Sequence, residues 1–170
     1  KEITAYHEAG HALVAASLKN ADPVHKVSIV SRGQTGGYTL KLPTEEMHLK
    51  ARSQFFADIA TMMGGYTAEL AVFGEMSTGA SNDLRQASEL ARKLVTQYGM
   101  SDKLGPMTFG KTQELIFLGR EISTEKNYSE SVAKSIDDEV GSFIMRAYHA
   151  AQKIVSSRRI VLDAIAKAFL

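Results

Sequence analysis

Two histidines and a glutamate near the start of the chain have the spacing of a catalytic metal site. They form the string His7-Glu8-Ala9-Gly10-His11, an HExxH motif. Residues four apart on a helix lie on one face, so the side chains of His7 and His11 can bind one ion. A bound Zn²⁺ lowers the pKa of a water to about 7, and the Glu8 carboxylate can then accept its proton. The motif therefore predicts metal-assisted hydrolysis with Glu8 as general base.

The residues around the motif favour this interpretation over two solvated histidines on a surface helix. Apolar residues recur at three- and four-residue spacing from Ile3 to Leu18, which predicts a helix with a buried face. Ala9 and Gly10 are small and leave space beside the two histidines. Gly10 is also costly inside a helix, by about 1 kcal/mol relative to alanine.

The third protein ligand does not follow from the motif alone. A catalytic zinc site usually has three protein ligands and one open position. The metzincin pattern would place glycine at 14 and histidine at 17, but the chain has Val14 and Ser17. A thermolysin-like arrangement needs a glutamate on a later helix, whereas residues 29–34, at the matching distance, contain no carboxylate and indicate strand and turn.

Several histidines and carboxylates remain as candidates. His25 lies in an expected strand, His48 near an expected helix start and His149 late in a long helix, and we expect all three to face solvent. The carboxylates that follow the motif include Asp58, Glu69, Glu75 and Asp83. Asp83 lies in a glycine-containing loop that enters a helix, where its carboxylate could instead stabilise the first turn. From the residues alone, Asp83 and Glu69 are equally good third ligands.

The elements that must position these residues are predicted to be mostly helices. The expected helices span 3–18, 44–73, 82–98, 129–156 and 158–170, and Gly64-Gly65 is expected to break or kink the second. Two strands are expected at 24–30 and 38–42, separated by the turn 31–37. Residues 76–81 are expected to be a loop, and residues 99–119 are expected to be irregular. The predicted fold is mainly α with one small β element near the N-terminus.

Composition limits the function classes further. The chain has 170 residues and is 44% hydrophobic, enough to bury one core. Twenty basic and nineteen acidic residues give no support to bulk nucleic-acid or membrane-surface binding. No cysteine is present, which excludes disulfides, Cys₄ zinc sites, Fe–S clusters and thiol catalysis. The chain opens at Lys1, without methionine and inside an expected helix, so we expect an excised domain of a longer protein.

The second expected strand is a candidate for substrate binding. Gly37, Tyr38, Thr39 and Leu40 follow a flexible turn, close in sequence to the HExxH helix. With two strands predicted, at least one has an unpaired edge. Such an edge beside a metal site can pair with an extended peptide through main-chain hydrogen bonds, which tolerate many side chains. The alternative is that the apolar side chains of this strand simply cover the helices.

The motifs of the whole chain, in order, resemble one known family. They are His7-Glu-Ala-Gly-His11, Gly64-Gly65 with Ala68-Glu69, Ser77-Thr-Gly-Ala-Ser-Asn-Asp83-Leu84, Tyr98-Gly99 with Leu104-Gly-Pro106, Leu118-Gly-Arg120, and Ile136-Asp137 with Glu139-Val140. This set resembles the peptidase domain of FtsH-type ATP-dependent zinc metalloproteases. The resemblance implies a helical zinc-metalloprotease domain over residues 1–170.

The resemblance also implies roles for individual residues. His7, His11 and Asp83 would bind one Zn²⁺ per chain, with Glu8 as catalytic base and Glu69 in a supporting position. The family commonly has arginine after the double glycine and a second glutamate after the position of Glu69, where this chain has tyrosine and leucine. Neither is a ligand position, so the resemblance still implies activity.

For the full-length protein, the resemblance implies a membrane anchor and an AAA+ ATPase module before this domain. The ATPase would unfold proteins and feed them to a homo-hexameric peptidase chamber facing the cytoplasm, or an organellar equivalent. No phosphate-binding loop of the GxxxxGK[ST] type occurs here, so ATP would act only through the missing module. The fragment itself is expected to be soluble, to bind membranes only through the missing anchor, and not to bind nucleic acid.

Two other function classes remain compatible with the motif. One is a metal-dependent hydrolase of small amides or acyl groups, which would have a closed pocket instead of a peptide-length groove. The other is a helical assembly module with a vestigial motif, which the intact Glu8 argues against.

Overall fold

The computed structural model describes residues 1–28, 38–41, 49–113 and 123–170. Their elements in chain order are α1 (Glu2–Ser17), β1 (Val24–Ser28), β2 (Tyr38–Lys41), α2 (Arg52–Phe73), the 3₁₀ turn η1 (Thr78–Ala80), α3 (Ser81–Thr96), β3 (Lys111–Gln113), β4 (Ser123–Glu125), α4 (Glu130–Ser157) and α5 (Arg159–Lys167). The prediction of a mainly helical domain is confirmed.

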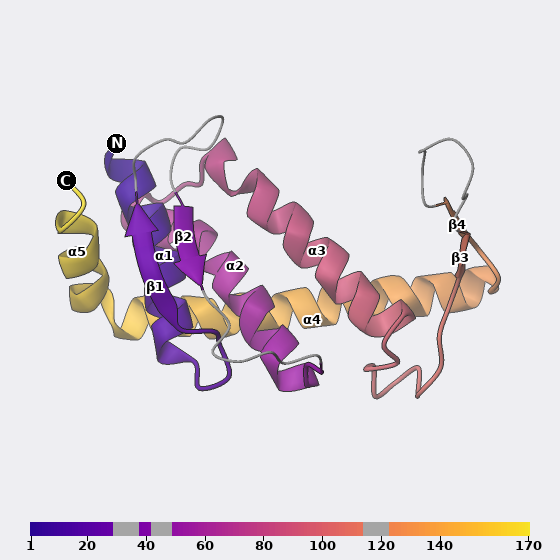
Figure 1. Cartoon of the computed structure of the whole chain (residues 1–170). Coiled ribbons are helices and arrows are strands. Elements are labelled where there is room, and N and C mark those ends of the chain that lie inside the picture. The colour runs from indigo at the N-terminus through magenta and orange to yellow at the C-terminus, as the bar shows by residue number, and fades with distance from the viewer. Residues whose placement is uncertain (29–37, 42–48, 114–122) are drawn as a thin grey trace.

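The long helix α4 runs the length of the molecule, with α2 and α3 packed on it (Figure 1). Helix α1 lies between α2 and α5, and β1 and β2 also contact it. The C-terminal segment contacts both ends of α1: Arg158 Nη1 donates to Ser17 Oγ at 2.8 Å, and Lys1 Nζ donates to the Leu170 carbonyl at 3.0 Å. The N- and C-terminal ends therefore lie together, while β3 and β4 lie at the opposite end.

The helix that carries the HExxH motif is a core helix. Every residue from Ala5 to Ala15 is buried, so α1 has no solvent-exposed face over three turns. Neighbours can surround it because five of these eleven residues are alanine or glycine, which allow close packing. Within the described ranges, none of the helices is both long and apolar enough to span a membrane.

The prediction that Gly64-Gly65 breaks or kinks its helix is wrong, because α2 continues without interruption to Phe73. The glycines serve a close contact between helices instead. A Cβ at Gly10 of α1 would lie 2.2 Å from the carbonyl oxygen of Gly64, and a Cβ at Gly64 would lie 2.6 Å from the carbonyl oxygen of Gly10. Two backbones approach this closely only where neither residue has a side chain.

The start of α2 also differs from the expectation. The expected start at 44 lies outside the described residues, but Leu49 and Lys50 are not helical and α2 begins at Arg52. The first turn is stabilised by the Gln54 side chain, whose Oε1 accepts from the N–H of Ala51 at 2.7 Å. A capping contact three residues apart thus sets the helix start later than the apolar pattern indicated.

The described residues contain two antiparallel strand pairs, where one was expected. Strands β1 and β2 are antiparallel, with Val27 opposite Thr39 and an irregularity between Val24 and Lys26. Strands β3 and β4 form a second antiparallel pair, with Thr112 opposite Thr124, in a region expected to be irregular up to residue 119. These strands have three residues each, too short for an alternating pattern to be recognised.

Candidate metal centre

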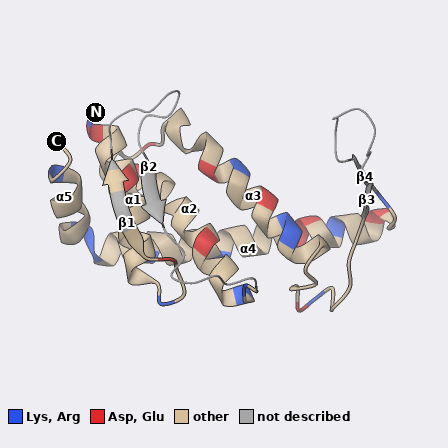
Figure 2. Ribbon diagram, viewed as in Figure 1, with Lys and Arg blue, Asp and Glu red and all other residues tan. Residues whose placement is uncertain are grey.

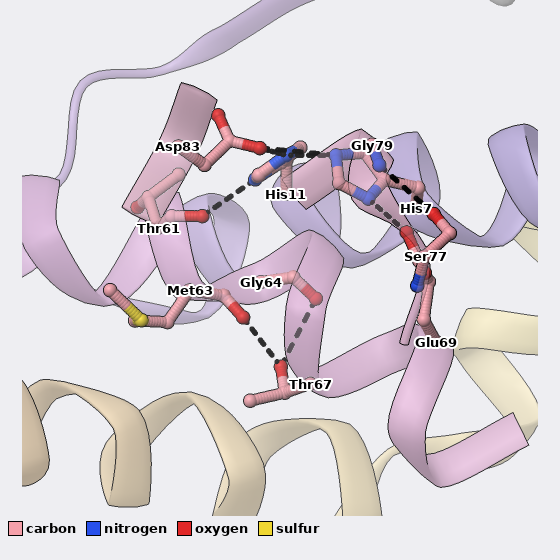
Figure 3. Close-up of polar contacts among 10 residues, drawn as sticks. All are labelled: His7, His11, Thr61, Met63, Gly64, Thr67, Glu69, Ser77, Gly79 and Asp83. Carbon is pink, nitrogen blue, oxygen red and sulfur yellow. Dashed lines mark hydrogen bonds and ion pairs between the residues drawn. The ribbon is translucent and has the colours of Figure 1, made fainter. Parts of the chain in front are cut away.

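Three helices bring the candidate ligands together (Figure 3). Helix α1 supplies His7 and His11 on one face, as their spacing predicts. Asp83 lies in the first turn of α3, after the 3₁₀ turn Thr78–Ala80. Helix α2 lies alongside and supplies Glu69.

The ligand atoms of three side chains converge. His7 Nε2 lies 3.1 Å from His11 Nε2 and 3.1 Å from Asp83 Oδ2, and His11 Nε2 lies 3.3 Å from Asp83 Oδ2. Both histidines are buried, and about a quarter of the Asp83 side chain is exposed. In the described part of the chain, this is the one histidine and carboxylate cluster compact enough to hold a metal ion.

The other nitrogen of each imidazole is bonded to an acceptor on α2. His11 Nδ1 donates to the Thr61 carbonyl at 2.7 Å, and His7 Nδ1 donates to Glu69 Oε1 at 2.6 Å. A carbonyl or a carboxylate can only accept, which places a proton on each Nδ1. In the neutral imidazoles, both Nε2 lone pairs then point toward the Asp83 carboxylate.

This donor set fits zinc. Three lone-pair atoms face one another at 3.1–3.3 Å, an arrangement that repels itself unless a cation lies between them. Ligand atoms at about 2.0–2.2 Å from a tetrahedral Zn²⁺ are about 3.3–3.6 Å apart, within a few tenths of an ångström of the observed separations. Imidazoles held by a carboxylate or carbonyl are also the usual arrangement around protein-bound zinc.

The pKa values of the cluster reflect the same convergence. Burial disfavours a charged His7, but hydrogen bonds with Asp83 and Glu69 outweigh it, and the pKa of His7 is raised. Burial would raise the pKa of Asp83, but where Nε2 of His11 or His7 carries a proton, its hydrogen bond holds that pKa well below its ordinary value. The site therefore favours positive charge between these side chains, and a metal ion would compete with a proton for it.

A glycine on α2 makes room for the first histidine. A Cβ at Gly65 would lie 2.4 Å from Cε1 of the His7 ring. The two adjacent glycines thus have different partners: Gly64 contacts the α1 backbone, and Gly65 contacts an imidazole.

Apart from Glu8, the remaining sequence candidates lie away from the cluster or outside the described residues. Helix α1 buries Glu8 next to His7. Asp58 pairs with Lys50 at 2.7 Å, and Glu75 and His149 are exposed. His48 and Gly37 fall outside the described residues, as do the side chains of His25, Tyr38, Thr39 and Leu40, although the backbone of the last three forms most of β2.

Sequence reasoning missed two backbone groups at this site. The Thr61 carbonyl accepts from His11, and the N–H of Ser77 donates to Glu69 Oε2 at 2.5 Å. Neither contact depends on a side chain, so residue type gives no signal for it. Thr61 is also 50 residues from His11 in the sequence, whereas Ser77 is eight residues from Glu69.

Comparison with known proteins identifies the domain. The family model described as Peptidase family M41 matches residues 1–170. The chain belongs to this family. It is 55% identical over 166 residues to the ATP-dependent zinc metalloprotease FtsH 1 of Sphaerobacter thermophilus, covering 98% of this chain and 25% of that protein. It is 53% identical over 173 residues to the ATP-dependent zinc metalloprotease FtsH of Chloroflexus aggregans, covering all of this chain and 26% of that protein.

These comparisons confirm the expected family and enzyme class. The M41 chain is a zinc metalloprotease domain, as the HExxH motif and the resemblance predicted. It spans about a quarter of the length of the curated relatives that it matches, including the FtsH protein of Veillonella parvula, which is 49% identical over 170 residues.

Proposed function

We propose that the M41 domain is a zinc endopeptidase that cleaves unfolded or misfolded proteins, with His7, His11 and Asp83 as ligands of one Zn²⁺. The convergence of their Nε2 and Oδ2 atoms at 3.1–3.3 Å is the observation that carries the proposal. A zinc ion bound there would supply a water of lowered pKa and would polarise the peptide carbonyl. Glu8 accepts the proton of the attacking water and delivers it to the leaving amine. Glu69 and the Thr61 carbonyl hold the two imidazoles with Nε2 toward the ion.

The proposal is tested by zinc content and peptide cleavage in the same preparation. The chain should bind one zinc, cleave casein, lose activity to a chelator and regain it with zinc. His11→Ala should abolish both properties, and His149→Ala is the matched control because His149 is exposed on α4. Cleavage that survives complete zinc removal would contradict the proposal, and cleavage restricted to small amides would favour the other hydrolase class.

We further propose that β2 binds the substrate backbone. Support comes from the two-stranded pairing of β1 with β2, which leaves the second edge of β2 without a partner strand among the described residues, and from the contact of both strands with α1. Thr39→Pro removes a backbone donor and should raise KM for peptides at full zinc content. Thr39→Ala keeps that donor and serves as the control. Equal KM values for both folded variants would contradict a pairing of the substrate at Thr39.

We also propose that residues 1–170 form one peptidase domain of a longer membrane-anchored protein. Support comes from the relatives, which are named ATP-dependent and are about four times as long as the matched segment. An AAA+ module then supplies unfolded substrate to a homo-hexamer on the cytoplasmic side, or an organellar equivalent. In the full-length protein, folded substrates should require ATP while short peptides should not. Equal cleavage of both without ATP would contradict this coupling.

A further inference from the structure

One buried carboxylate connects two elements of the metal centre. Glu69 Oε1 accepts from His7 Nδ1 at 2.6 Å, and Glu69 Oε2 accepts from the backbone N–H of Ser77 at 2.5 Å. The Glu69 side chain is 2% exposed, so water does not substitute for either partner. The two oxygens therefore serve different segments: one holds the HExxH helix, and the other holds the chain that leads into α3 (Figure 3).

A short capped turn connects Ser77 to the helix that carries Asp83. Ser77 caps the 3₁₀ turn, because its Oγ accepts from the N–H of Gly79 at 3.1 Å. Ala80, the last residue of the turn, is buried, and α3 follows directly at Ser81. Only this 3₁₀ turn and the start of α3 separate Ser77 from Asp83, so we expect a displacement at Ser77 to move Asp83.

We propose that Ser77 is a positioning residue of the metal centre, acting through its backbone N–H instead of its hydroxyl. The N–H fixes the turn to Glu69, and Glu69 fixes His7, so one carboxylate sets the separation between His7 and Asp83. This inference rests on the proposed function, since it assumes that both residues bind zinc. Hydrogen bonds to a carboxylate are stronger than those between neutral groups, so a single backbone N–H can hold the turn against Glu69.

Two substitutions at Ser77 separate the backbone contact from the side-chain cap. Ser77→Pro removes the N–H and the hydroxyl, whereas Ser77→Ala removes only the hydroxyl. The extended backbone of Ser77, with φ −95° and ψ 170°, lies near the conformation that proline prefers. The difference in zinc affinity between the two variants therefore reports the contribution of the hydrogen bond from the Ser77 N–H to Glu69.

The decisive measurement is zinc affinity by chelator competition, with the visible spectrum of the Co²⁺-loaded chain as a report on ligand geometry. Ser77→Pro should weaken zinc binding about 10- to 100-fold and shift the Co²⁺ bands, as loss of a group that orients ligands does. Ser77→Ala, which removes the cap but keeps the backbone N–H, should lose clearly less than Ser77→Pro on both measurements. Parental affinity and spectrum in Ser77→Pro would overturn the inference, and equal losses in both variants would assign the effect to the hydroxyl.

A third variant decides the question if Ser77→Pro does not fold. In Glu69→Gln the amide has one oxygen, which can accept from His7 or from Ser77 but not from both. Zinc affinity should fall, and the backbone amides of 77–83 should exchange hydrogen faster. Unchanged affinity and exchange would overturn the inference. The parent chain distinguishes failure of this inference from failure of the proposed function. If the parent chain binds no zinc, the proposed function is wrong. If the parent binds zinc and the variants bind it equally well, only the role of Ser77 is wrong.

Discussion

The contact between α1 and α2 differs in kind from the contact between α3 and α4. At the first, Gly10 and Gly64 bring two backbones together, and the histidines and Glu69 are buried with all their hydrogen bonds made inside the protein. At the second, aliphatic residues such as Leu94 and Ile136 fill the core, and the polar contact between Arg92 and Asp137 lies in solvent. Basic and acidic residues are interspersed along α3 and α4 (Figure 2).

The comparison shows where substitutions should matter. A buried polar cluster in close-packed surroundings cannot replace a lost partner with water and cannot accept added volume. In an exposed ion pair, water can replace a lost partner, since solvent already screens both charges. The same chemical change should therefore have large effects at the α1–α2 contact and small effects at the α3–α4 contact.

The largest expected effect comes from the buried carboxylate beside the first histidine. Glu8→Gln keeps the shape of the side chain but removes the base, so peptide hydrolysis should fall about 10²- to 10⁴-fold. Zinc content and the circular dichroism spectrum should match those of the parent. Metal stoichiometry and turnover are measured on the same sample. Activity within a few-fold of the parent would be incompatible with Glu8 as general base.

The next effect separates two carboxylates that both contact His7. Asp83→Ala removes a proposed ligand atom and should reduce zinc affinity by more than Glu69→Ala, for which we expect a loss of roughly 10- to 100-fold. Competition with a chromogenic chelator gives both constants. If Glu69→Ala releases the metal and Asp83→Ala retains it, the proposed ligand set is wrong.

A smaller effect, on stability, tests the close approach of the two helices. Gly10→Ala places a Cβ 2.2 Å from the Gly64 carbonyl oxygen, and relieving this clash should cost about 1–3 kcal/mol of unfolding free energy. Gly141→Ala is the matched control, because a Cβ in this part of α4 would contact nothing within 4 Å. There, alanine should stabilise the protein by roughly 0.5–1 kcal/mol. Urea denaturation measures the change in unfolding free energy for both variants. If both variants were stabilised, or both destabilised, the argued difference between the two glycine positions would be wrong.

The smallest effect is expected at the α3–α4 surface. Arg92→Ala removes the 2.9 Å contact with Asp137, in which both side chains are at least half exposed. The unfolding free energy should change by about 0–1 kcal/mol, less at high salt, and zinc affinity should be unchanged. Urea titration of this variant and of the parent gives the change in unfolding free energy. A loss as large as that of Gly10→Ala would show that the two contacts do not differ as argued.

Much of this structure follows from local patterns in the sequence. The long helix was predicted at 129–156 and begins at Glu130, because Ser129 caps it and its apolar residues repeat at helical spacing. The spacing of His7 and His11 predicted that both would lie on one face. Both features depend on residues within a few turns of each other, and periodicity and capping act over that range.

Other features depended on contacts between distant segments. From the residues alone, Asp83 and Glu69 were equal candidates for the third ligand, and only the resemblance favoured Asp83. In the structure, Asp83 Oδ2 approaches both Nε2 atoms, while Glu69 reaches only Nδ1 of His7. Which of the two carboxylates lies near the Nε2 atoms depends on how α2 and α3 pack against α1. Asp83 is 76 residues from His7, so local sequence patterns give no signal for this packing.

By itself, the sequence determined the helices, the HExxH face and the absence of thiol chemistry, because each of these is a matter of residue type and short spacing. The tertiary structure decided which carboxylate faces the open side of the imidazoles, and that Gly64 and Gly65 serve packing instead of a kink. These outcomes depend on the distance between backbones of different helices. A glycine in a helix lowers stability wherever it lies, and only the neighbour that occupies the space of its missing side chain shows why it is there.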